Sequence, residues 1–127
     1  MMHWFSIGVA VLAATAIIAL GIMYLTKPRT ATESFGLPLP EEGANTDWWL
    51  RLKGSRDIVS GLIVFALLAW GDLRLLGIVL LIQAITPICD MSTILAAKGS
   101  TGRALGIHGL TAALMILAAI PLITGLA

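Results

Sequence analysis

Residues 73–97, with the sequence LRLLGIVLLIQAITPICDMSTILAA, form a nearly unbroken apolar run that is interrupted by the carboxylate of Asp90. A helix that crosses a hydrocarbon core of about 30 Å needs about 20 mostly apolar residues, so this run predicts a transmembrane helix. A charged group inside such a helix costs several kcal/mol unless it is paired or hydrated. Asp90 is therefore a candidate functional residue.

Three further apolar runs predict helices at about residues 4–26, 48–70 and 102–125. The chain is 58% hydrophobic and only 12% charged, whereas a soluble domain carries about 25% charged residues. The missing charge indicates that much of the surface faces lipid. We therefore expect one all-α domain over residues 1–127, an integral membrane bundle of four transmembrane helices. The first apolar run is too long for the core of a secretion signal, so we expect it to be retained.

The boundaries of the first two helices follow from proline and capping signals. Pro28 cannot continue the hydrogen bonding of the first helix. Residues 27–46 are polar and rich in glycine and proline, so they are expected to form a long first loop that could fold back as a lid. Asp47 is the expected N-cap of the second helix.

The remaining connections are expected to be short. Gly71 and Asp72 predict a tight turn, which would make the second and third helices antiparallel neighbours. Pro87 predicts a kink in the third helix. Gly99 is the expected C-cap of that helix, and a third loop at about residues 98–101 leads into the fourth.

Lysine and arginine side chains are distributed unevenly between the two ends of the predicted bundle. The opposite end carries only Arg74, whereas the first and third loops and the adjoining helix starts carry Lys27, Arg29, Arg51, Lys53, Arg56, Lys98 and Arg103. Cytoplasmic loops carry the excess of basic residues in membrane proteins. We therefore expect these loops in the cytoplasm and both termini outside, in a cytoplasmic or inner membrane.

Several classes of function find no support in the composition. The net charge of +1 gives no reason to expect a nucleic-acid partner. The single cysteine, Cys89, excludes an internal disulfide and a cysteine-based metal cluster. The sequence contains no metal motif, phosphate loop or nucleophile elbow, so we expect neither a cofactor nor a metal.

Three ionisable side chains from different helices are expected at one depth. With a rise of about 1.5 Å per residue, Asp57 lies about 15 Å from the loop-side end of its helix, and Asp90 and His108 lie about 12 Å from theirs. All three of these ends face the predicted cytoplasmic side. Together with the adjacent Arg56, these residues predict a polar pocket near the cytoplasmic face and are the candidate catalytic residues.

Polar neighbours at spacings of three, four or seven residues share helix faces with these groups. The residues predicted to line the pocket and bind substrate are Lys53, Ser60, Gln83, Thr86 and Thr111. Small residues on the fourth helix, Gly102, Gly106 and Gly109, would let polar helices approach closely.

The chemistry of this set favours proton transfer. Two carboxylates in a poorly hydrated pocket cannot both stay charged at low cost unless Arg56 compensates. A protonated acid beside an ionised carboxylate is a general acid/base pair, and histidine ordinarily changes charge near neutral pH. An Asp–Arg–Asp set can activate water and protonate a leaving oxygen, as in soluble epoxide hydrolases of the limonene type. The same groups could move a double bond or start a cyclisation.

The first hypothesis is therefore a membrane-embedded acid/base enzyme of hydrolase, isomerase or cyclase type. Asp57 and Asp90 would be its acid and base, His108 a proton partner, and Arg56 a clamp for an oxyanion or carboxylate. Its partners would be a lipophilic small molecule and the surrounding membrane lipid.

The same residues also fit a purely structural arrangement. Arg56 and Asp90 could form an ion pair that locks the second helix to the third. Asp57 could pair with Lys53 one turn earlier, and His108 could bind a backbone carbonyl.

Two further hypotheses concern a small proton-coupled transporter and an accessory protein. The chain has the size of the small multidrug exporters, but it lacks their acidic residue in the first helix. The small residues Ala10, Ala14 and Gly21 on the first helix, with the glycines of the fourth, could instead serve a homodimer or another partner.

The run from Lys53 to Asp57, followed by Gly61, Asp90 and His108, resembles a family of small membrane proteins known as domain of unknown function 4267. The stretch at residues 34–38, SFGLP, is similar to the first loop of that family. This resemblance covers nearly the whole chain and implies an integral membrane fold of four helices. It implies no established activity. The positions that match the family's polar pattern are Lys53, Gly54, Arg56, Asp57, Asp90 and His108.

Overall fold

The structure, a computed structural model, describes residues 1–126, which are helical with short connections and contain no β-strand. The elements are α1 (Met2–Thr26), α2 (Pro28–Glu33), α3 (Ala44–Trp70), α4 (Leu73–Gln83), α5 (Ile85–Ala96), α6 (Thr101–Arg103), the π-helix η1 (Ala104–Gly109) and α7 (Leu110–Thr124). This confirms the predicted all-α class.

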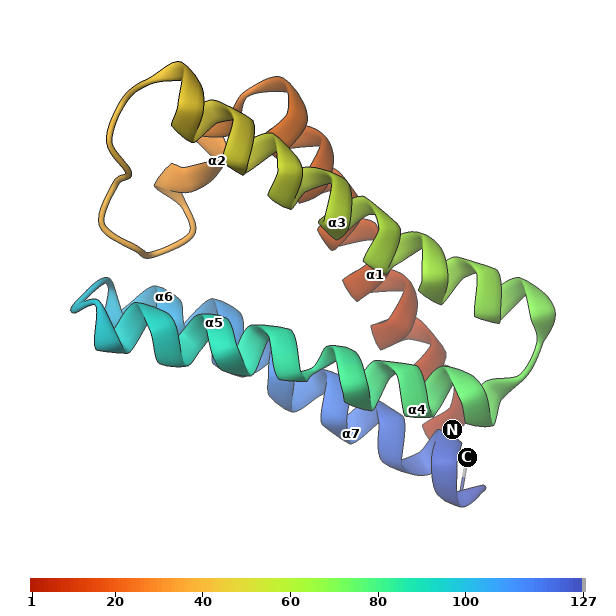
Figure 1. The fold of residues 1–127 in the computed structure, drawn as a ribbon. Coiled ribbons are helices and arrows are strands. Elements are labelled where there is room, and N and C mark those ends of the chain that lie inside the picture. The colour runs from red at the N-terminus through yellow and green to blue at the C-terminus, as the bar shows by residue number, and fades with distance from the viewer. Residues whose placement is uncertain (127) are drawn as a thin grey trace.

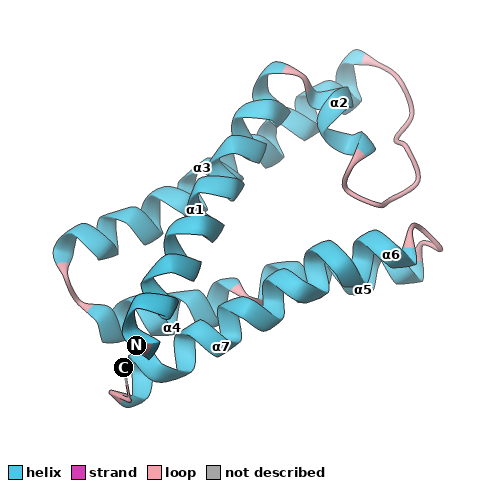
Figure 2. Cartoon of the chain, turned by 180° about the vertical axis from the view of Figure 1, so that it is seen from behind, coloured by secondary structure: helices cyan, strands magenta, loops and turns pink. Residues whose placement is uncertain are grey.

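The long helices form two pairs, α1 with α3 and α4–α5 with the segment from α6 to α7 (Figure 1). The pairs meet at the end of the molecule that holds both termini, and they diverge toward the end that holds α2 and residues 34–43 (Figure 2). The turn at Gly71 joins α3 to α4, but each of these helices packs mainly against a different partner. The predicted tight turn is therefore present, but the two helices diverge from it instead of packing as close neighbours along their length.

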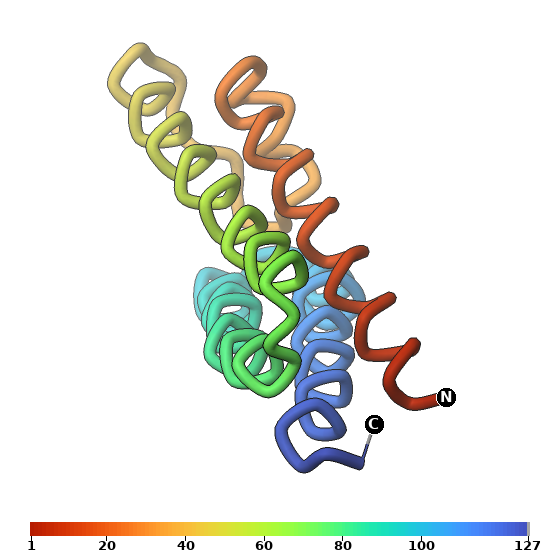
Figure 3. Tube along the Cα trace, turned by 90° about the vertical axis from the view of Figure 1, so that its right-hand side faces the viewer, coloured from red at the N-terminus to blue at the C-terminus, as the bar shows by residue number. Residues whose placement is uncertain are grey.

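Small residues set the close contact between α1 and α3, which Figure 3 shows side by side. A Cβ atom added at Gly61 would lie 2.7 Å from the carbonyl oxygen of Ala14, and one added at Gly54 would lie 2.6 Å from that of Gly21. Lipid tails are as apolar as these helices, so close backbone packing is what favours their association in a membrane. Ala14 and Gly21, which the sequence offered as possible dimer contacts, therefore pack against α3 of the same chain.

The apolar core lies where the two helix pairs meet. Its buried members are Ala10, Ala14, Val64, Leu76, Leu80, Ala84, Met115, Ala119 and Leu122. Gly77 of α4 brings that helix close to α7, since an added Cβ would lie 2.8 Å from the Cβ of Leu122. This half of the molecule is filled by side chains from both pairs.

Two predictions about the first loop were wrong. The first helix ends at Thr26 as predicted, but residues 27–46 are not all loop, since Pro28 begins the short helix α2. Proline is tolerated there because the first position of a helix needs no backbone N–H from its residue. The N-cap of α3 is Gly43, one turn before the predicted Asp47. Asp47 lies in the first turn, where its Oδ1 atom is 3.4 Å from a guanidinium nitrogen of Arg29.

The third predicted helix is divided at Ala84 into α4 and α5. Pro87 has no N–H to donate to the carbonyl of Gln83, which explains a break at this point. At the end of α5, the left-handed residue is Lys98, with φ of 54°, and not the predicted Gly99. The amides of Lys98 and Gly99 donate to the carbonyls of Leu95 and Ile94, the hydrogen bonds of a Schellman motif.

Three helical segments within residues 1–126 are long and apolar enough to cross a membrane: Met2–Thr26, Leu73–Ala96 and Thr101–Thr124. These segments indicate an integral membrane protein. The fourth long helix, α3, carries Arg51, Lys53, Arg56 and Asp57 in its first half, and it is not among them. A fourth span through α3 stays a prediction.

Candidate functional site

The side chains of Asp90 and His108 face each other between α5 and η1. An Oδ2 atom of Asp90 lies 3.7 Å from Nδ1 of His108, and the histidine is buried. His108 belongs to the π-helical turn η1, and the hydroxyl of Thr111, at the start of α7, donates to the carbonyl of Ile107 in that turn at 2.6 Å. Wide π-helical turns occur often at functional sites, and here the turn carries the only ionisable side chain that contacts Asp90 within residues 1–126.

The first loop supplies the second contact of this histidine. Nε2 of His108 lies 3.0 Å from the carbonyl oxygen of Phe35, and the two rings lie 4.6 Å apart between centroids. The backbone around Phe35 is fixed by the amide of Ser100, which donates to the carbonyl of Gly36 at 2.8 Å. Arg103 donates to the carbonyl of Glu33 at 2.6 Å. The first loop thus folds back onto the α5–α6 turn, as the lid prediction expected.

An ion pair lies on α3, close to these residues. Nζ of Lys53 is 2.6 Å from Oδ2 of Asp57, one helical turn along. The same ammonium lies 4.3 Å from the ring centroid of Tyr24 and 5.3 Å from that of Phe35. Aromatic faces attract a cation at such distances, so Lys53 is held by one carboxylate and two rings.

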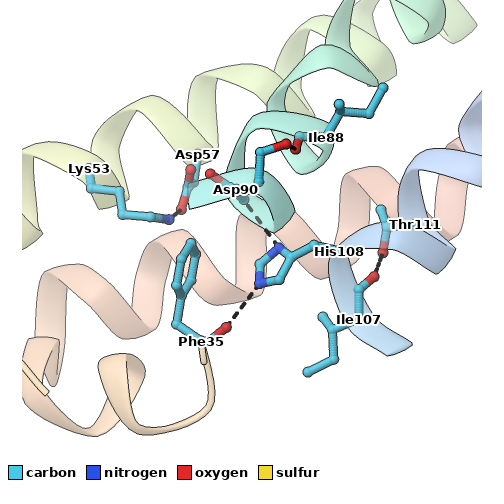
Figure 4. Close-up of polar contacts among 9 residues, drawn as sticks. Phe35, Lys53, Asp57, Ile88, Asp90, Ile107, His108 and Thr111 are labelled. Atoms are coloured by element: carbon cyan, nitrogen blue, oxygen red, sulfur yellow. Dashed lines mark hydrogen bonds and ion pairs between the residues drawn. The ribbon is translucent and has the colours of Figure 1, made fainter. Parts of the chain in front are cut away.

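The Asp90–His108 pair and the Lys53–Asp57 ion pair lie on either side of the Phe35 ring (Figure 4). Asp57 and Asp90 point into the same space between α3 and α5 in that view. Within residues 1–126 no hydrogen bond joins the two carboxylates directly. The structure therefore brings Asp57, Asp90 and His108 to one region, with Phe35 as the residue that contacts both pairs.

Arg56 lies outside this cluster. Its side chain is exposed, and it makes no ion pair within 4.0 Å in the part of the chain that the structure describes. Residues four apart share a helix face, whereas adjacent residues do not, so Lys53 and not Arg56 reaches Asp57. The expected ion pair between Arg56 and Asp90 is absent among residues 1–126, and the expected clamp role of Arg56 has no geometric support.

The predicted substrate-binding residues take different positions. Lys53 belongs to the cluster. The side-chain nitrogen Nε2 of Gln83 donates to the backbone carbonyl of Ser60 at 3.2 Å, which links α4 to α3. The Ser60 and Thr111 hydroxyls bond to backbone carbonyls of their own helices, and Thr86 is exposed. Within residues 1–126 none of these four side chains makes a hydrogen bond to the cluster, although Thr111 lies near His108 (Figure 4).

An open pocket of about 180 Å³ adjoins Lys53 on the side of the first loop. Its wall is largely apolar, and the lining residues are Tyr24, Thr32, Phe35, Leu37, Pro38, Pro40, Leu50 and Lys53. Residues from α1, α2, α3 and residues 34–43 meet here, so the pocket exists only because the first loop folds back.

The family model described as Domain of unknown function (DUF4267) matches residues 14–122. The chain belongs to this family. The match confirms the resemblance that the polar motifs indicated. No curated protein and no solved structure matches the chain.

The DUF4267 match spans every predicted site residue and all the residues that line the pocket. Sequence reasoning missed Tyr24 and Phe35 as site residues. Tyr24 is the one tyrosine of the chain and lies at the loop-side end of α1, among otherwise aliphatic residues, and this could have marked it. Within residues 1–126 no three His, Cys, Asp or Glu side chains gather closely enough to hold a metal ion.

Proposed function

We propose that this DUF4267 protein is a membrane-embedded acid/base enzyme that acts on a lipophilic small molecule. The observation that supports this proposal is the meeting of the Lys53–Asp57 ion pair and the Asp90–His108 pair at one aromatic ring beside a mostly apolar pocket. Apolar pockets with a few converging polar groups are the usual form of small-molecule sites. An ionisable group inside a membrane protein is costly unless it is paired or hydrated, so such groups often mark functional sites.

The proposal includes α3 as the fourth transmembrane helix. It packs along α1, and its charges are confined to the half near the first loop, while residues 58–70 are apolar apart from Ser60. The exposed Trp48 and Trp49 lie at the same charged end, as expected for residues at a membrane–water interface. This end carries seven of the eight basic residues, so we place it in the cytoplasm.

The proposed roles follow from the contacts. The Asp90–His108 pair accepts and returns a proton, because a carboxylate and an imidazole can each bind one and the two groups face each other. Lys53 donates to an oxygen on which negative charge develops, as preorganised donors do in many enzymes. Asp57 holds Lys53 in place through its contact of 2.6 Å.

The position of the core favours an enzyme over a transporter. The polar cluster lies toward the end with the first loop, whereas the end with both termini is filled by the buried core of Ala10, Val64, Leu80 and their neighbours. A transporter needs access from both sides of the membrane. A one-sided site suits a substrate that arrives from one leaflet.

Purified protein in phosphatidylcholine nanodiscs would test the proposal with two apolar probes, a long-chain terminal epoxide and a β,γ-unsaturated ketone. Mass spectrometry in D₂O would detect hydrolysis, isomerisation or deuterium uptake. We expect turnover of one probe to fall about 100-fold or more in Asp90→Asn, the size of a general acid/base contribution. The melting temperature should stay close to that of the parent protein.

Thr86→Val is the matched control, since Thr86 lies one turn away on the same helix with an exposed side chain. It should retain turnover. If Asp90→Asn lowers the melting temperature and neither probe reacts with the parent protein, the cluster is structural and the proposal fails.

A further inference from the structure

Lys53 is the one charged residue among the side chains that line the pocket in the described chain. An ammonium has three N–H donors, and the contact of 2.6 Å with Asp57 uses one of them. The ring faces of Tyr24 and Phe35 attract the cation without accepting a conventional hydrogen bond. Lys53 therefore retains the capacity to donate to an oxygen atom in the pocket.

The charge of the Lys53–Asp57 pair selects among possible oxygen ligands. Because the pair sums to zero, a carboxylate ligand gains attraction from Lys53 and suffers repulsion from Asp57. A cationic ligand is repelled by the ammonium of Lys53, which lies in the pocket wall. A neutral carbonyl oxygen accepts the hydrogen bond without either penalty, and a hydrogen bond from a charged donor is stronger than one from a neutral donor.

The size and wall of the pocket define the rest of the ligand. The volume of about 180 Å³ is below the range of about 300–1,000 Å³ that holds a whole drug-sized ligand. The pocket is open, and its far wall consists of Leu37, Pro38, Pro40 and Leu50. It therefore fits the polar end of a ligand whose apolar tail extends toward lipid.

We propose that the pocket binds a neutral carbonyl compound with an apolar tail, such as a ketone, whose oxygen accepts a hydrogen bond from Lys53. This inference rests on the proposed function for its chemistry, although binding itself does not. Asp90 and His108 do not line the pocket in the described chain but lie past the Phe35 ring, which is itself part of the pocket wall. The carbon beside the carbonyl would therefore extend past that ring to the Asp90–His108 pair, which would take a proton from it. The electrons of that C–H bond form a C=C bond, and the oxygen becomes an enolate held by Lys53. Return of the proton to carbon restores a ketone, so no oxidant or reductant is consumed.

The binding test uses three probes with tails of similar length: decan-2-one, decanoate and decylammonium. Ligand-observed NMR in phosphatidylcholine nanodiscs gives Kd values, with empty nanodiscs to subtract partition into lipid. We expect the ketone to bind about tenfold more tightly than either charged probe, as one charge-assisted hydrogen bond allows. Equal binding of all three probes, or tighter binding of a charged one, would overturn the inference.

Two variants locate the contact at Lys53. Lys53→Gln should weaken ketone binding about tenfold, whereas the matched control Arg56→Gln, which removes an exposed cation on the same helix, should not change it. Asp57→Asn should shift the preference toward decanoate, because it leaves a net positive charge in the pocket. If Lys53→Gln fails to fold, this switch in Asp57→Asn still decides the inference, and an unchanged preference contradicts it.

Deuterium uptake separates this inference from the proposed function. In D₂O we expect the parent protein to exchange the protons beside the carbonyl of bound decan-2-one, and Asp90→Asn to bind the ketone without exchange. Selective binding with no exchange in the parent protein would uphold the ligand class and contradict acid/base catalysis on it. Turnover of the epoxide without selective binding of the ketone would support acid/base catalysis and contradict the proposed ligand class.

Discussion

At the scale of single residues, the contacts of His108 define which nitrogen carries its proton. A backbone carbonyl can only accept a hydrogen bond, so Nε2 must hold a hydrogen where it meets Phe35 at 3.0 Å. In the neutral ring, Nδ1 is then the basic nitrogen, and it is the atom that faces Asp90 at 3.7 Å. The first loop thereby orients the imidazole of His108 toward Asp90 through one carbonyl group.

Two substitutions of His108 separate the structural contact from the chemical one. His108→Gln keeps an N–H that can reach the Phe35 carbonyl but has no basic nitrogen, whereas His108→Ala loses both. We expect His108→Ala to lower the free energy of unfolding by about 1–3 kcal/mol, the cost of an unsatisfied buried polar group, and His108→Gln to lower it much less. Both should abolish deuterium exchange.

Chemical denaturation in detergent measures these stabilities, with His3→Ala near the N-terminus as the control for loss of a histidine. Equal destabilisation by the glutamine and alanine variants would contradict the assigned role of Nε2.

Residue-level prediction from the sequence succeeded where helical spacing decides the outcome. The structural alternatives for Lys53–Asp57 and for a carbonyl partner of His108 are both present. The carbonyl belongs to Phe35, 73 residues away, and no local pattern identifies a partner so distant in the chain. The prediction that Arg56 joins the cluster is not supported by its position. The rise along a helix gives the depth of a residue, but the rotation around the helix axis decides which side chain faces the cluster.

At the scale of elements, the docking of the first loop depends on the absence of a side chain at Gly99. A Cβ atom at this position would clash with the carbonyl oxygen of Gly36, the group that accepts from the amide of Ser100. Because backbone lies on both sides of this contact, neither can yield as a flexible side chain would. Gly99 was predicted as a helix cap, but its role is to admit the first loop.

We therefore expect Gly99→Ala to displace residues 34–43 from the α5–α6 turn. Hydrogen–deuterium exchange should show an increase of about tenfold or more at the amide of Ser100, since loss of its partner lowers the local opening free energy. Gly106→Ala is the matched control, because a Cβ added there has nothing within 4 Å. Unchanged protection at Ser100 in Gly99→Ala would show that the loop does not depend on this contact.

At the scale of the whole molecule, the lengths of the apolar runs predicted the positions of the long helices. The distribution of basic residues predicted that the first and third loops lie at the same end of the bundle. The first and third loops do lie together, since Gly36 contacts Ser100 and Arg103 contacts Glu33. The divergence of the two helix pairs could not be predicted, because it depends on which small residues meet across helices. Ala14 with Gly61 joins α1 to α3, and such a match is invisible in either segment alone.

The orientation in the membrane gives the last prediction. The exposed Cys89 is first replaced by alanine, and single cysteines are then introduced at Glu41, in the exposed first loop, and at Leu126, which is exposed at the opposite end. Because seven of the eight basic residues lie at the Glu41 end, that end should face the cytoplasm. In intact cells, a membrane-impermeant maleimide should label Leu126→Cys, and it should label Glu41→Cys only after the membrane is permeabilised. Labelling of Glu41→Cys from outside would place the pocket on the outer face, so the proposed substrate would have to arrive from the outer leaflet.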